Sequence, residues 1–166
     1  MSCPERKVSQ NQRRGRQSAV IQNRRRGRHL AIILAYAYEQ KSYQDDEALY
    51  LDDDENGVFA EASWAFGQDL LQDFIAHRQA IDQVVDGCLT NWTIGRLAIL
   101  DRCLLRMGCC ELLHRPDIPI KTIFNEYIEL AKSYGSDART AGLVNGVLDS
   151  IARAHRPAAE MRPARP

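Results

Sequence analysis

The sequence lacks the features that mark a membrane span, a secretory leader or a common catalytic site. No apolar run approaches the roughly 18 residues that a bilayer requires, and the N-terminus has no short apolar core of a secretory signal. The patterns GxxxxGK[ST], GxGxxG and GxSxG, which mark phosphate loops and nucleophile elbows, are all absent. We therefore expect a cytoplasmic protein that is not an enzyme, has no catalytic residues and needs no cofactor. An organellar transit peptide is the alternative for the Arg-rich leader, although residues 1 to 20 offer few apolar positions for an amphipathic face.

Metal-ligand spacing is also missing. No CxxC pair and no HExxH motif occurs, and three of the five cysteines lie inside apolar runs, which favours buried reduced thiols over ligands. The cysteines are Cys3, Cys88, Cys103, Cys109 and Cys110. The four histidines are scattered, so we interpret them as packed or surface residues. The sequence thus predicts no metal site.

What the sequence does contain is strongly segregated charge. Residues 1 to 30 hold nine Lys or Arg against Glu5 alone, a net charge of +8, whereas residues 45 to 55 hold seven acids and no base. Such a basic end favours an anionic partner. Arg24, Arg25, Arg26 and Arg28 stand at the front of the first predicted helix, where basic side chains are unfavourable unless an anion binds there.

Nucleic acid is the partner that these arginines favour. Arginine makes bidentate phosphate contacts and stacks on unpaired bases, and each neutralised phosphate releases counterions. An anionic membrane surface is the main alternative. A solvated tail that only aids solubility is the simplest structural interpretation.

The pattern of apolar residues predicts an all-α fold with about seven helices. We expect a disordered basic arm over residues 1–23, a helical domain over 24–155 and a disordered tail over 156–166. Apolar residues recur at intervals of three and four throughout the domain, and no segment alternates as a strand does. Residues 58–76 and 77–90 fit two helices or one broken helix. The helix from Ile99 is apolar over most of its circumference, which predicts the centre of a bundle.

Two groups of charged residues in the predicted helices fit structural or solvent-exposed roles. Arg106 stands among apolar neighbours, and we expect it to bind open carbonyls or a carboxylate, so that Arg106→Ala lowers the melting temperature. Glu126 and Glu129 share one helix face, but no partner acid, base or nucleophile is identifiable. We interpret these two glutamates as a solvated face.

Three segments carry a resemblance to a known family. RRRGRHLAIILAYAYE (24–39), ILDRCLLRMGCCELLHRPDIPIKTIFNEYIELAKSYG (99–135) and LVNGVLDSIAR (143–153) closely resemble NusB, the bacterial transcription antitermination and ribosome biogenesis family. The resemblance covers roughly residues 24–153 and implies two three-helix subbundles. It also implies binding to the boxA element of nascent rRNA together with NusE, a small-subunit ribosomal protein, and assembly with other Nus factors on RNA polymerase.

The resemblance also implies site residues. The RNA-binding residues would be Arg24, Arg25, Arg26 and Arg28, and charge alone adds Arg13, Arg14 and Arg16. The NusE-facing surface would include Tyr36, Asp101 and the segment from Asp137 to Leu143. This segment departs from the family, because SDARTAGLVNG is one residue longer than the usual family sequence and Leu143 replaces an aromatic residue.

Two points stay open beside this interpretation. A NusB-like domain also precedes the methyltransferase of some rRNA cytosine methyltransferases, but that enzyme needs a cofactor-binding sheet and a nucleophilic cysteine in several hundred further residues. We therefore favour the adaptor. The sequence also leaves open whether the free protein forms a homodimer and whether the acidic segment restrains the basic arm.

Overall fold

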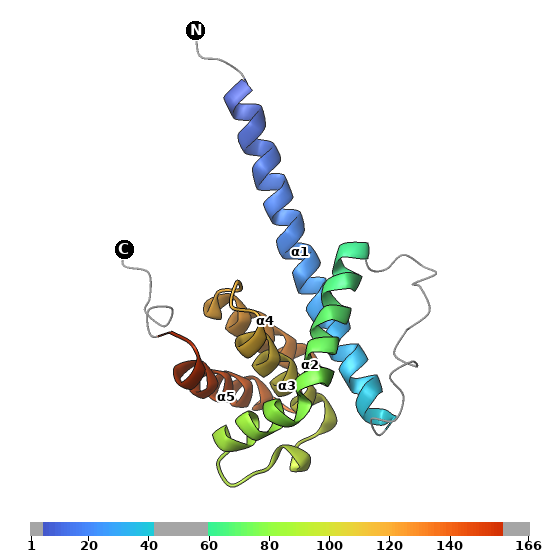
Figure 1. Cartoon of the computed structure of the whole chain (residues 1–166), viewed down its shortest axis with the longest axis vertical. Coiled ribbons are helices and arrows are strands. Elements are labelled where there is room, and N and C mark those ends of the chain that lie inside the picture. The colour runs from blue at the N-terminus through green and yellow to red at the C-terminus, as the bar shows by residue number, and fades with distance from the viewer. Residues whose placement is uncertain (1–4, 42–59, 158–166) are drawn as a thin grey trace.

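The computed structural model describes residues 5–41 and 60–157, with side chains from Arg13 onward (Figure 1). The described residues form five α-helices and one 3-10 turn and contain no strand, so the predicted all-α fold is confirmed with fewer helices than expected. The helices are α1 (Glu5–Gln40), α2 (Glu61–Cys88), α3 (Ile99–His114), α4 (Ile120–Tyr134) and α5 (Thr140–His155), and the turn is η2 (Ile94–Arg96). None of the described helices is long and apolar enough to cross a membrane.

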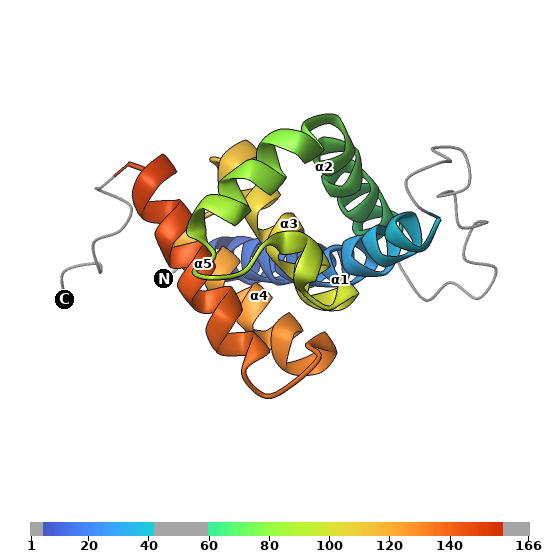
Figure 2. The ribbon, with the colours of Figure 1, turned by 90° about the horizontal axis from the view of Figure 1, so that it is seen from below.

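Helix α3 lies at the centre of the molecule. It contacts α1 and α2 on one side and α4 and α5 on the other, so the two predicted three-helix subbundles share it (Figure 2). Nearly every residue from Cys103 to Leu112 is buried, which confirms the predicted bundle centre. The thiols of Cys103 and Cys109 are buried and free, and burial raises the pKa of each to about 12. Cys3 lies outside the described residues.

Helices α1 and α2 run in the same direction and touch at a pair of glycines. Ser63 and Gly67 of α2 lie against Gly27 of α1, and further along the rings of Tyr38 and Phe74 pack edge to face at 6.3 Å. A Cβ atom on Gly67 would lie 2.7 Å from the carbonyl oxygen of Gly27. Only hydrogen at both positions therefore allows this approach, which fixes α1 against α2 directly beside the arginine cluster.

Two expectations about the helices differ from the structure. α2 is continuous over 28 residues, where the sequence favoured two helices or a break. α1 begins at Glu5, where the sequence predicted a disordered arm over 1–23, and its first half projects beyond the bundle (Figure 1). The buried half of α1 supplies the helix nucleus, and adding exposed turns to an existing helix needs no second nucleation. Residues 1–4 and the acidic segment 45–55 lie outside the described residues.

Buried ion pairs tie the helices of the first subbundle together. Arg106 donates to the two carboxylate oxygens of Asp82 at 2.7 and 2.9 Å and also contacts Glu39, whose side chain is 1% exposed. Arg102 contacts the same glutamate. The structural interpretation of Arg106 is confirmed by these contacts, and its effect on the melting temperature stays a prediction.

Arg156 corrects the predicted start of the C-terminal tail. The sequence analysis assigned residues 156–166 to a disordered tail, but the Arg156 side chain is buried. Its guanidinium donates to the carbonyl oxygens of Leu112 and Ile118 at 3.3 and 2.8 Å, and to those of two residues between them. Five donors on one planar group satisfy carbonyls that the end of α3 leaves open. Residues 158–166 lie outside the described part of the chain.

Candidate nucleic-acid interface

Three of the four arginines predicted to bind RNA lie at the surface of α1, where this helix leaves the bundle. Arg25 and Arg26 are exposed, and the Arg24 side chain is 40% exposed. They lie in the middle of a 36-residue helix and not at its N-terminus. The backbone amides of these turns are therefore occupied within the helix, which corrects the expectation that these arginines stand at the front of a helix. Any anion here is bound by the arginine side chains.

Arg28 is not part of this surface. Its side chain is 2% exposed, and its Nε donates to both carboxylate oxygens of Glu111 at 3.1 and 2.9 Å. Glu111 itself is fully buried in α3. A buried guanidinium that already binds a carboxylate at two points has no face left for a phosphate. This residue joins α1 to α3, and its burial disfavours the predicted RNA-binding role.

The exposed arginines are held loosely by carboxylates from the second subbundle. The Arg24 Nη2 lies 3.3 Å from Asp117 Oδ2, and the Arg25 Nε lies 3.9 Å from Glu126 Oε2. Glu126 is thus an ion-pair partner rather than part of a purely solvated face. Just beyond them, His29 Nδ1 lies 3.1 Å from the Tyr134 hydroxyl. The α1 backbone, held against α2 at Gly27, sets the position of these arginines at the edge that faces the second subbundle.

The additional candidates Arg13, Arg14 and Arg16 are exposed on the projecting half of α1. Arg13 and Arg24 are eleven residues apart, about three helical turns, so they share one face about 16 Å apart. Exposed Val20 and Ile21 lie between them. The structure thus brings the two arginine groups onto one continuous rod.

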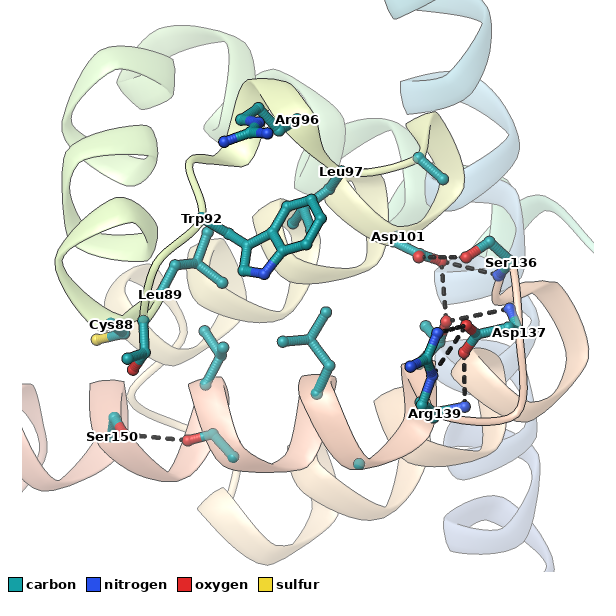
Figure 3. A pocket seen from close by; sticks show the side chains of 17 residues that line it. Cys88, Leu89, Trp92, Arg96, Leu97, Asp101, Ser136, Asp137, Arg139 and Ser150 are labelled. Carbon is teal, nitrogen blue, oxygen red and sulfur yellow. Dashed lines mark hydrogen bonds and ion pairs between the residues drawn. The ribbon is translucent and has the colours of Figure 1, made fainter.

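Most of the predicted partner residues line a separate pocket of about 630 Å³ (Figure 3). Asp101, Asp137 and Leu143 line it, between the end of α2, η2 and the start of α5. Tyr36 is 38% exposed on α1 and does not line the pocket. Three of the four predicted partner residues are therefore brought together, and the fourth lies elsewhere.

Asp101 is nearly buried and its oxygens are already used. It accepts hydrogen bonds from the Ser136 amide at 2.9 Å, the Ser136 hydroxyl at 2.6 Å and the Thr140 hydroxyl at 3.2 Å. This carboxylate orders the connection between α4 and α5. The partner-facing role that the resemblance implied for Asp101 stays a prediction, and its observed contacts are with the α4–α5 connection.

Sequence reasoning missed two residues that line this pocket. Trp92 is 54% exposed, and the Arg96 guanidinium lies 5.2 Å from the centre of its ring. Asn91 before it has φ 63°, the left-handed conformation that asparagine tolerates in turns. A tryptophan next to an asparagine between two helical segments is the signal that could have revealed an exposed aromatic turn.

Within the described residues, no group of three or more His, Cys, Asp or Glu side chains is arranged to hold a metal ion. His77 and His114 stack with ring centres 4.1 Å apart, and burial lowers the pKa of His114. His77 is exposed and His114 is partly buried, which fits the surface and packed roles expected from the sequence.

Comparison with known proteins adds a family to this geometry. A model of the NusB family matches residues 24–153. The transcription antitermination protein NusB of Geobacter sulfurreducens is 45% identical over 104 residues, which covers 63% of this chain and 73% of that protein. Several other curated NusB proteins align over 61% of their own length.

Solved structures share the fold. T. maritima NusB matches with a TM-score of 0.73 and 30% identity, over 83% of this chain and 96% of that chain. A complex of the antitermination factors NusB and NusE with dsRNA matches with a TM-score of 0.72 over 81% of this chain and 98% of that one. Its identity is 24%, so this likeness shows the fold alone. The family match extends from the exposed arginines of α1 almost to the end of α5, and on this evidence the chain belongs to the NusB family.

Proposed function

We propose that this chain is a non-catalytic RNA-binding adaptor in transcription antitermination. It binds the boxA element of nascent rRNA together with NusE, joins other Nus factors on RNA polymerase in the cytoplasm, and supports rRNA transcription and maturation. The observation that carries the proposal is the cluster of exposed arginines, Arg24 to Arg26, held at a fixed edge in a member of the NusB family. The methyltransferase-domain alternative gains no support from the comparisons.

The arginines would act as phosphate ligands through their side chains alone. Each phosphate that they neutralise releases counterions, so the logarithm of the binding constant falls with the logarithm of salt concentration at about 0.7 per phosphate for single strands. Arg24 to Arg26 alone predict a slope of about −2. If Arg13, Arg14 and Arg16 also bind, the slope steepens to about −4.

The experiment is a titration of boxA-type and scrambled single-stranded RNA at several salt concentrations, with and without NusE. We expect weak, salt-dependent binding of both RNAs by the chain alone and tighter, boxA-selective binding once NusE is present. Equal and weak binding of both RNAs in the presence of NusE would contradict the proposal. The measured salt slope shows in the same experiment whether Arg13, Arg14 and Arg16 also bind RNA.

The pocket that Leu143 and Asp137 line is the proposed NusE-facing surface. Gly142 also lines it, and a Cβ atom there would meet nothing within 4 Å, so a larger side chain fills the pocket without disturbing the core. Gly142→Gln should therefore weaken NusE binding and leave RNA binding by the chain alone unchanged. Gly87→Gln is the matched control, since Gly87 is equally open and does not line the pocket. Equal NusE affinity for both variants would place the partner surface elsewhere.

A further inference from the structure

Arg24 and Arg25 differ from the buried arginines in how their side chains are held. Arg28 and Arg106 each bind a carboxylate at two points, with Nε as one of the donors. Arg24 and Arg25 each approach one carboxylate oxygen, at 3.3 and 3.9 Å, with half-exposed side chains. One ion-pair contact near water holds a guanidinium weakly. The Arg24 guanidinium also lies 5.9 Å from the centre of the Phe66 ring, a contact that leaves the number of its ion pairs unchanged. These pairs are therefore open to exchange with another anion.

The carboxylates that face these arginines, Asp117 and Glu126, belong to ordered backbone. Asp117 lies between Pro116 and Ile118, whose carbonyl oxygens are both held by the buried Arg156 at 3.4 and 2.8 Å. Glu126 belongs to α4, and its side chain is 20% exposed. Both negative charges are thus fixed beside the cluster by the backbone of the second subbundle.

A phosphate and these carboxylates need the same donors. The Nη2 of Arg24 and the Nε of Arg25 are the groups that face Asp117 and Glu126, and a bidentate phosphate contact uses such donors too. Once RNA is bound, each carboxylate also lies close to a phosphate of like charge. Both effects oppose binding of any phosphate backbone, whatever its base sequence.

We propose that Asp117 and Glu126 are built-in competitors that lower the affinity of the arginine edge for RNA phosphates. This inference rests on the proposed RNA-binding function and names a regulation of that same site. Because the competition acts on phosphate contacts, it lowers affinity for boxA-type and scrambled RNA by the same factor. It therefore keeps the free protein from holding arbitrary RNA and leaves selection to the bases and to NusE.

The test compares RNA affinities of Asp117→Asn, Glu126→Gln and the double variant with the wild-type chain at low and high salt. Each single change should tighten binding of both RNAs about two- to fivefold, which is the scale of a partly exposed ion pair, and the gain should shrink at high salt. Glu129→Gln is the matched control. It removes the same charge one turn along α4, where the carboxylate pairs with Lys132 at 2.6 Å.

Three results are distinguishable. Tightening by Asp117→Asn and Glu126→Gln well beyond that of Glu129→Gln supports the inference. Equal effects of Glu126→Gln and Glu129→Gln would overturn it, because the carboxylates would then act only through general charge. Weaker RNA binding by Asp117→Asn and Glu126→Gln would also overturn it, because these carboxylates would then position the arginines. Absence of a boxA preference in the wild-type chain with NusE would instead contradict the proposed function. The affinities of the variants for scrambled RNA would still test whether the carboxylates compete with phosphate.

Discussion

Arginine serves two separate purposes in this chain, and residue type alone does not separate them. Arg28, Arg106 and Arg156 are buried and join elements that are far apart in sequence. Arg25 and Arg26 are exposed at the edge of α1. Arg28 lies only two positions from Arg26, yet one residue stabilises the bundle and the other is available to a ligand. The deciding factor is the side of the helix on which each lies.

Arg28→Ala tests this separation at the level of one residue. It removes one partner of a buried ion pair and leaves Glu111 charged without a counterion, so we expect a loss of about 3–5 kcal/mol in the free energy of unfolding. Denaturant unfolding measures this directly. Arg26→Ala, on the exposed side of the same turn, should change stability by less than about 0.5 kcal/mol. A similar small effect for both variants would mean that Arg28 is not structural.

Arg156→Ala tests the pinning of the loop after α3. The variant leaves several nearly buried carbonyl oxygens without a donor, which should lower the free energy of unfolding by about 1–3 kcal/mol. Arg153→Ala is the control, because Arg153 lies on the same final turns but pairs with Asp149 at the surface. Thermal melts of both variants measure the difference. If both variants lower the melting temperature by the same small amount, Arg156 does not stabilise the fold.

At the scale of elements, α1 combines a buried half and an exposed half in one continuous helix. Most apolar residues from Leu30 to Tyr38 pack in the first subbundle, and the close approach at Gly27 and Gly67 sets where α1 crosses α2. The crossing also sets the position of the exposed arginines, because they occupy the helical turn directly before it. An error in the crossing would therefore move the basic edge as well as weaken the core.

Gly67→Ala tests the crossing. Its new Cβ atom would meet the backbone oxygen of Gly27 at 2.7 Å, so the helices must separate, and we expect a loss of about 1–3 kcal/mol in the free energy of unfolding. Gly87→Ala is the control in the same helix, where nothing lies within 4 Å and alanine should add a few tenths to about 1 kcal/mol through helix propensity. Equal stabilisation by both changes would contradict the close helix contact.

At the scale of the whole molecule, much of the architecture could be predicted from the sequence. Apolar residues at intervals of three and four place the helices, and the nearly all-apolar segment from Ile99 predicts a central helix, because local periodicity records which side is buried. The extension of α1 to Glu5 could not be predicted, since residues 13–22 are exposed and the added turns depend on the helix that follows.

The sequence predicted only part of the candidate RNA and partner sites, because long-range partners leave no local signal. Charge identified the candidate segment, and Arg24 to Arg26 lie at the surface. The partner of Arg28 lies 83 residues away in α3, and such a long-range pair leaves no local signal in the sequence. The same holds for Asp101, whose hydrogen-bond partners are 35 and 39 residues away. The projecting rod of α1 and its exposed arginines remain the feature on which the proposed RNA binding depends.

The most direct test of that claim is the boxA RNA affinity of the Arg25→Ala, Arg26→Ala double variant across a salt series, beside the wild-type chain. We predict weaker binding and a salt slope flatter by about 1.4, the value for two lost phosphate contacts on a single strand, with unchanged helicity and melting temperature. Wild-type affinity and slope in the folded double variant would contradict the account, because RNA would then bind without the exposed arginines of α1.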